Sequence, residues 1–101
     1  MGLETILWIQ IAQARNKKYC AVIHNRRTGR TRRVNFGDAR YGQYKDQTRL
    51  RAYAAKDHGD PARRRSYFKR HSGVSTKAAA LRKERARGVI TAKLLSHTYL
   101  W

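Results

Sequence analysis

The distribution of large aliphatic side chains limits how this chain can fold. Val, Ile and Leu are frequent over residues 3–36 and 89–101, whereas residues 37–88 contain only Leu50, Val74 and Leu81. Hydrophobic residues make up 41% of the 101 residues, which is enough for one core in a single small domain. We therefore expect the two ends of the chain to build this core together, while the middle is thinner and more exposed.

Three segments near the start of the chain are rich in β-branched and aromatic residues, as strands are: 5–11 (TILWIQI), 19–24 (YCAVIH) and 31–36 (TRRVNF). Both faces of the first segment are apolar, so it could be a central strand, with a short buried helix as the alternative. The intervening NRRTGR contains Asn25 and Gly29, which is typical of a hairpin loop. The pattern predicts a three-stranded antiparallel β-meander over about 4–36, and Gly37 ends the sheet after Phe36.

A first helix is expected after a polar connection that contains tyrosines. Asp46 is its expected N-cap, and the helix should run to about His58, where Gly59 serves as the C-terminal glycine. One face of this helix collects, at spacings of three and four, Leu50, Tyr53, Ala54 and Asp57.

A second helix is expected over 60–72 (DPARRRSYFKRHS), because Asp60 is a good N-cap and Pro61 is favoured at the first helical position. At 100° per residue, one face of this helix carries Arg64, Tyr67, Phe68 and His71. We predict that Arg64 is structural, with its stem packed and its guanidinium stacked on a ring or reaching the surface. The flanking cations are free to meet phosphate: Arg63 and Arg70 on one side, Arg65 and Lys69 on the other.

Two more segments have helical character. Residues 76–87 (TKAAALRKERAR) are strong helix formers, but Leu81 is the one large apolar side chain there, so we expect this helix to be mobile or held by a partner. In residues 89–101 the side chains of Ile90, Leu94, His97 and Trp101 recur at helical spacing, and this end is expected to dock onto the sheet or another subunit.

The expected fold class is α+β, with a three-stranded antiparallel β-meander followed by three or four α-helices. The chain is expected to form one small basic domain over 1–101, with the meander at about 4–36 and the helical part at about 46–101. A helix-turn-helix around the HGDP turn, with 60–72 as the recognition helix, is an alternative to a plain helical pair.

The charge of the chain indicates its class of partner. Lys and Arg number 24 against 6 Asp and Glu, which gives a formal net charge of +18 at pH 7. A compact body with this charge repels itself, so a polyanion would stabilise it, and nucleic acid is the favoured candidate. An anionic membrane or an acidic protein surface are the alternatives. The sequence has no run of 18 apolar residues, so we expect no membrane span.

The cations form two clusters, each interleaved with aromatic residues. The loop cluster consists of Arg26, Arg27, Arg30, Arg32 and Arg33, and the helix cluster of Arg63, Arg65, Lys69 and Arg70. Both could be solvated surfaces, but the carboxylates are too few to neutralise them, so we predict that they bind anions. Contacts to phosphates would position the protein on nucleic acid without specifying bases.

Asp57, His58 and Asp60 raise the question of metal or acid–base chemistry. Asp60 has a sufficient role as a helix cap, and Asp57 lies near many cations. The histidines have no metal-ligand spacing with Cys20. Because Cys20 is the one cysteine of the sequence, an internal disulfide is also excluded. We expect no catalytic residue, metal, cofactor or small-molecule substrate. A small nuclease is the alternative, and it would depend on Asp57 and Asp60.

Three stretches of the chain carry a family resemblance: KKYCAVIHNRRTGRTRRVNFGDARYGQYKD, DPARRRSYFKRHSG and LLSHTYLW. Together they resemble a family of small basic proteins of large double-stranded DNA viruses. The matching positions are Lys17, Lys18, Tyr19, Phe36, Gly37, Tyr41, Tyr44, Asp60, Arg63, Arg64, Tyr67, Arg70, His71, Leu100 and Trp101. This chain departs from the family pattern between Lys45 and Gly59 and carries more sequence before the final Leu-Trp.

The resemblance implies a viral origin and a place in the virion, as a minor capsid or internal component, and it implies no enzyme activity. We expect a non-enzymatic virion structural protein whose arginine-rich surfaces bind genome DNA, through its phosphates, or an acidic capsid surface. Its partners would be nucleic acid and other virion proteins, in the particle and, during assembly, in the host cytoplasm or nucleus. The alternative is a free DNA- or RNA-binding module that acts in packaging or gene expression.

Overall fold

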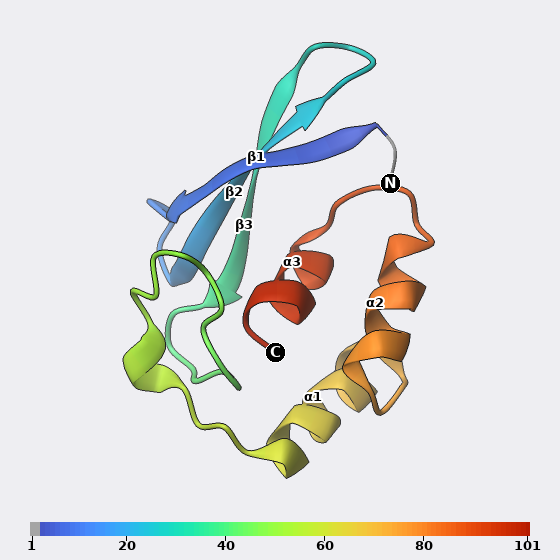
Figure 1. Ribbon diagram of the computed structural model, residues 1–101. Helices are drawn as coiled ribbons and strands as arrows, with labels where there is room; N and C mark the ends of the chain where they lie inside the picture. Colours follow the sequence, from blue (N-terminus) through green and yellow to red (C-terminus); the bar gives the residue numbers. More distant parts are fainter. Residues whose placement is uncertain (1–2) are drawn as a thin grey trace.

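A computed structural model describes residues 3–101 and contains an antiparallel three-stranded sheet with a group of helices beside it (Figure 1). The strands are β1 (Glu4–Ile11), β2 (Lys17–Asn25) and β3 (Thr31–Asp38), in the order β1-β2-β3. After a short 3-10 helix, η1 (Ala54–Lys56), come α1 (Pro61–Ser72), α2 (Lys77–Arg85) and α3 (Ala92–Tyr99). The α+β class and the β-meander that the sequence predicts are confirmed.

β1 is an edge strand, so the interpretation of it as a central strand is wrong. Ile6 pairs with Ile23 and Trp8 pairs with Val22, which leaves Leu7 as the extra residue of a bulge. In a regular strand, side chains alternate between the two faces of the sheet, so residues 6 and 9 would point to opposite faces. The bulge shifts this alternation by one residue, and Ile6 and Ile9 both pack against the core. Leu7 and Trp8 are 46% and 51% exposed. The apolar character of both faces therefore reflects a bulged edge strand rather than burial on two sides.

The core joins the two ends of the chain, as the distribution of aliphatic side chains predicts. The sheet contributes Tyr19, Ala21, Ile23 and Phe36, and the C-terminal segment contributes Ile90, Leu94, Leu95 and Leu100. α3 packs on β3 with one side and on α2 with another, so it lies between the sheet and the other helices (Figure 1). The prediction that the C-terminal segment docks onto the sheet is confirmed.

The segment from Ala39 to Asp60 is a loop with the single turn η1, so the helix predicted over 46–58 is wrong. Asp46 does not cap a helix. Its carboxylate is fully buried and accepts hydrogen bonds from the Tyr19 hydroxyl, from Thr48 and from the Tyr53 backbone N–H. These bonds fix an irregular path that a helix could not follow. Without this helix, the helix-turn-helix alternative is also wrong.

α1 begins and ends as predicted. The Asp60 carboxylate accepts from the backbone N–H groups of Ala62 and Arg63, Pro61 is the first helical residue, and Gly73 ends the helix with φ +69°. α2 is held by more than Leu81, because Ala80 and Glu84 on the same helix are buried. The expectation that α2 is mobile or held by a partner overlooked a buried carboxylate, Glu84, which is described below.

Candidate functional site

The predicted loop cluster lies around the β2–β3 hairpin. Arg26, Arg27 and Arg30 are exposed at its tip, and Arg33 is exposed on β3. Arg32 differs from them, because its guanidinium binds both oxygens of the Glu4 carboxylate at 2.8 Å and donates to the Ile90 carbonyl oxygen. The Arg32 hydrogen bonds also lower the pKa of Glu4. Arg32 therefore joins β3 to β1 and to the start of the C-terminal segment.

The hairpin tip and α1 lie at opposite ends of a molecule that is 41 Å long (Figure 1). The fold does not bring the two predicted cation clusters together into one patch. On α1, Arg64 takes the structural position predicted for it. Its guanidinium lies 4.4 Å from the ring centroid of Tyr44, and its Nε donates to the Trp101 carbonyl oxygen at 2.9 Å.

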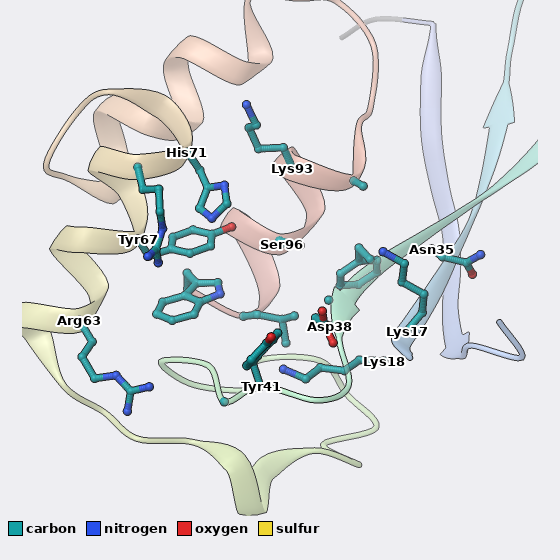
Figure 2. A pocket seen from close by; sticks show the side chains of 17 residues that line it. Lys17, Lys18, Asn35, Asp38, Tyr41, Arg63, Tyr67, His71, Lys93 and Ser96 are labelled. Carbon is teal, nitrogen blue, oxygen red and sulfur yellow. The ribbon is translucent and has the colours of Figure 1, made fainter. Parts of the chain in front are cut away.

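The flanks of α1 divide as predicted, and one of them borders a cleft of about 530 Å³ (Figure 2). Arg63 and Arg70 line this cleft, whereas Arg65 and Lys69 are exposed elsewhere on the helix. The cleft lies between α1, α3, the loop around Tyr41 and the ends of β2 and β3 where Lys17 and Asp38 pair. The other cations that line the cleft are Lys17, Lys18 and Lys93, and neither of the two predicted clusters contained them.

One wall of the cleft is aromatic. The rings of Tyr67 and Trp101 are stacked, with centroids 4.1 Å apart and an interplanar angle of 4°. The His71 ring lies 4.6 Å from Tyr67 at a tilt of 44°, and Tyr41, a residue that is 63% exposed, lines the cleft as well (Figure 2). Because Tyr67 is buried and Phe68 does not line the cleft, the rings of this wall that a ligand can reach are those of His71, Trp101 and Tyr41.

The cleft is strongly cationic, with positive side chains from three elements. Lys17 and Lys18 come from β2, Arg63 and Arg70 from α1, and Lys93 from α3. The lining residues include a single carboxylate, Asp38, which is already bound to Arg40 at 2.8 Å. Cations on several sides of one concavity raise the local concentration of anions, because their fields add inside the low-dielectric walls.

Lys18 is the least expected of these cations, since its side chain is buried. Its ammonium donates to the Gln43 side-chain oxygen, and among the described residues that is its one hydrogen-bond acceptor. Burial lowers the pKa of Lys18 to about 8, because desolvation disfavours the charged form. Gly37 lies on β3, the strand that pairs with β2, and has no room for a side chain. A Cβ at this position would meet Leu100 Cδ1 at 2.8 Å and Lys18 Cδ at 3.1 Å. Gly37 is therefore required by the packing of the cleft floor.

A buried hydrogen-bond chain fixes the aromatic wall from behind. Ser72 donates to the Glu84 carboxylate, so its oxygen must accept from His97 Nε2, and His97 Nδ1 is left to accept from the Tyr67 hydroxyl. Glu84 also accepts from Arg87 at 3.1 Å. Burial lowers the pKa of His97 to about 4, so the imidazole takes part in these hydrogen bonds in its neutral form. The chain connects all three α-helices and supports the Tyr67 ring.

The acidic residues considered for catalysis have structural roles. Asp60 caps α1, and Asp57 accepts from the Gln43 amide and the Asp46 backbone N–H. His58 packs 5.2 Å from Trp101, and its Nδ1 accepts from the Asp60 backbone N–H. Within residues 3–101, no group of three His, Cys, Asp or Glu side chains is placed to hold a metal ion. No helix in this range is long and apolar enough to cross a bilayer.

Most of the positions on which the family resemblance was proposed lie at the cleft. Of the fifteen positions, eleven line it: Lys17, Lys18, Phe36, Gly37, Tyr41, Arg63, Tyr67, Arg70, His71, Leu100 and Trp101. Comparisons of the chain with protein-family models, with curated proteins and with solved structures gave no match. The functional argument below therefore depends on the geometry and charge of the molecule itself.

Proposed function

We propose that the protein is a non-enzymatic component of the particle of a large double-stranded DNA virus, and that it binds the phosphates of nucleic acid with its exposed cations. The observation that carries the proposal is the state of the carboxylates. All six are engaged within residues 3–101, and their salt bridges involve only four cations, which are Arg32, Arg40, Arg51 and Arg87. Most of the 24 Lys and Arg side chains therefore lack an internal counter-charge.

Nucleic acid supplies the missing charge better than an acidic protein surface does. Exposed arginines at the hairpin tip and along α1 are separated by most of the length of the molecule, so a partner must present negative charge over a long distance. A phosphate backbone has this property, and binding it releases condensed counterions. Arginine suits the contact because its planar guanidinium can bind two phosphate oxygens at once.

The binding part of the proposal is tested by the affinity for a short DNA duplex over a series of salt concentrations. The logarithm of the affinity should fall linearly with the logarithm of the salt concentration, with a slope of about −0.9 for each phosphate neutralised. Arg65→Ala and Lys69→Ala should flatten this slope, whereas Arg65→Lys should preserve it because the charge remains. An affinity that does not depend on salt would contradict phosphate binding.

The location is tested by mass spectrometry of purified particles before and after removal of the outer shell. The protein is expected in the particles, and retention in the stripped core would favour contact with the genome over contact with the shell. Its presence in infected cells together with its absence from particles would contradict the virion role. The free nucleic-acid-binding module, which is the second candidate, would then stand.

A further inference from the structure

We propose that the cleft is a binding site for one unpaired nucleotide, with the phosphate held by the converging cations and the base stacked on the aromatic wall. The inference depends on the proposed affinity for nucleic acid and adds a specific ligand and place to it. The nucleotide can come from a free nucleoside monophosphate or from a single strand, since both present the same phosphate and base.

The shape of the site favours a small ligand over a duplex. The cleft volume of about 530 Å³ lies within the range of sites that enclose small molecules, which is roughly 300 to 1,000 Å³. A DNA duplex keeps its bases stacked inside and offers its phosphates to a protein, so a duplex would make no use of aromatic rings deep in a cleft. An unpaired nucleotide uses both the cations and the rings.

The aromatic wall provides a preorganised stacking surface. Trp101 is fixed by the parallel Tyr67 ring, and the Tyr67 hydroxyl is held in turn by His97. Base–aromatic stacking tolerates any base, since every base has a π-face. Tyr41, a residue that is 63% exposed and lines the same cleft, can contact the other side of a bound base.

The cations supply a phosphate site with one unusual member. Arg63 and Arg70 reach the cleft from α1, and Lys93 reaches it from α3. Among residues 3–101, the buried Lys18 ammonium has only the neutral Gln43 amide oxygen as a hydrogen-bond acceptor, although it carries three donors. A bound phosphate would supply a charged acceptor close to this buried ammonium and restore the stability that its desolvation costs.

The test uses the fluorescence of Trp101 in the full chain with Trp8→Phe, which removes the second tryptophan of the sequence. The probes are deoxyadenosine monophosphate, inorganic phosphate, a short oligo(dT) strand and a short blunt duplex. The monophosphate and the strand should both quench Trp101. Inorganic phosphate should bind about tenfold more weakly than the monophosphate, because it gains no stacking.

Two double variants separate the cleft from general charge. Arg63→Ala with Arg70→Ala should weaken binding of the monophosphate about tenfold or more. The matched control, Arg82→Ala with Arg85→Ala, removes the same charge from the exposed surface of α2 and should change this binding less than about twofold. Tyr41→Ala should weaken the binding of the monophosphate several-fold and leave the binding of inorganic phosphate unchanged. Equal melting temperatures of the two double variants exclude unfolding as the cause.

The outcomes distinguish the two proposals. Quenching by the strand at concentrations about tenfold lower than the monophosphate assigns the site to single strands, and similar affinities assign it to free nucleotides. Equal binding of phosphate and monophosphate, equal losses in both double variants, or no change in Trp101 fluorescence would overturn the inference. If the duplex still binds with its salt dependence in that case, the proposed function stands, and if nothing binds, both fail.

Discussion

The hairpin tip and the cleft are both rich in cations, but the fold uses them differently. At the tip, Arg26, Arg27 and Arg30 are exposed to solvent on a turn. In the cleft, cations from three elements face one concavity beside stacked aromatic rings. Under the proposed function, dispersed cations would give general attraction to anions, whereas cations that converge on a shaped surface would allow discrimination among anions.

The two regions also differ in how tightly the backbone is determined. Gly29 at the tip and Gly37 at the cleft floor have nearly the same left-handed conformation, with φ +73° and +79°. A Cβ at Gly29 would meet no atom within 4 Å, whereas a Cβ at Gly37 would lie 2.8 Å from Leu100 Cδ1. The tip therefore tolerates change and the cleft floor does not.

This difference gives the largest expected effect. Gly37→Ala should lower the free energy of unfolding by about 3 kcal/mol, because left-handed strain adds to a steric clash. Gly29→Ala has the strain alone and should cost about 1 kcal/mol. Thermal or denaturant unfolding measures both. Equal costs would show that the floor can relax and that the two regions do not differ in rigidity.

The support behind the aromatic wall should make the stability depend on pH. His97 has a pKa of about 4 in the fold against 6.5 when exposed, so unfolding takes up a proton between these values. The contribution of the buried neutral His97 to the free energy of unfolding is fully present above pH 6.5. This contribution is lost as the pH falls towards 4, and the free energy of unfolding then drops by about 2 to 3 kcal/mol.

Unfolding of the parent and of His97→Gln over this pH range provides the measurement. Burial also lowers the pKa of His58 and His71, and both act in the same direction, so the difference between the two proteins isolates His97. Parallel curves for the parent and the variant would contradict a buried neutral imidazole at position 97.

A smaller effect on stability is expected for Arg64, which contacts Tyr44 in the loop and Trp101 in the C-terminal segment. Arg64→Ala removes the stack on Tyr44 and the bond to the Trp101 carbonyl oxygen, and should cost about 1 kcal/mol of stability. The adjacent Arg65→Ala removes an exposed cation and should stay within about 0.5 kcal/mol of the parent. Melting curves of the two variants test whether adjacent arginines really have different roles.

The smallest effect on stability is expected at the hairpin tip. Arg26→Ala should change the free energy of unfolding by less than about 0.5 kcal/mol, since its side chain is exposed. It should still reduce the salt slope of duplex binding by about 0.9 if it contacts one phosphate. An unchanged slope would remove the tip from the binding surface and leave α1 and the cleft as the remaining candidates.

Local sequence signals predicted the parts of the fold that local chemistry determines. The hairpin followed from alternation and turn residues, and α1 followed from Asp60, Pro61 and Gly73. The role of Arg64 followed from its helical angle relative to Tyr67 and Phe68. For the hairpin and α1 the deciding interactions lie within a few positions along the chain, whereas Arg64 was placed by its helical angle although its partners Tyr44 and Trp101 are distant in the sequence.

The errors came from contacts between distant positions. Asp46 looks like a helix cap, but Tyr19, remote in the sequence, donates to its carboxylate and helps to hold it in a loop. The bulge at Leu7 depends on its pairing with β2, and the burial of Glu84 depends on Ser72. The cleft was missed for the same reason, since Lys17, Lys93 and Trp101 meet only after the ends of the chain have packed.

The stacking of Trp101 on Tyr67 has a practical consequence. Backbone N–H groups of Lys45 and Gln47 donate to the carbonyl oxygens of Leu100 and Tyr99, so the residues just before Trp101 are held against the loop. Trp101 itself lines the cleft, so any polypeptide joined after it would start at the proposed binding site. If the proposed nucleotide binds in the cleft, an affinity tag or fluorescent protein fused there should weaken its binding, whereas the same label joined near Leu3, which does not line the cleft, should not.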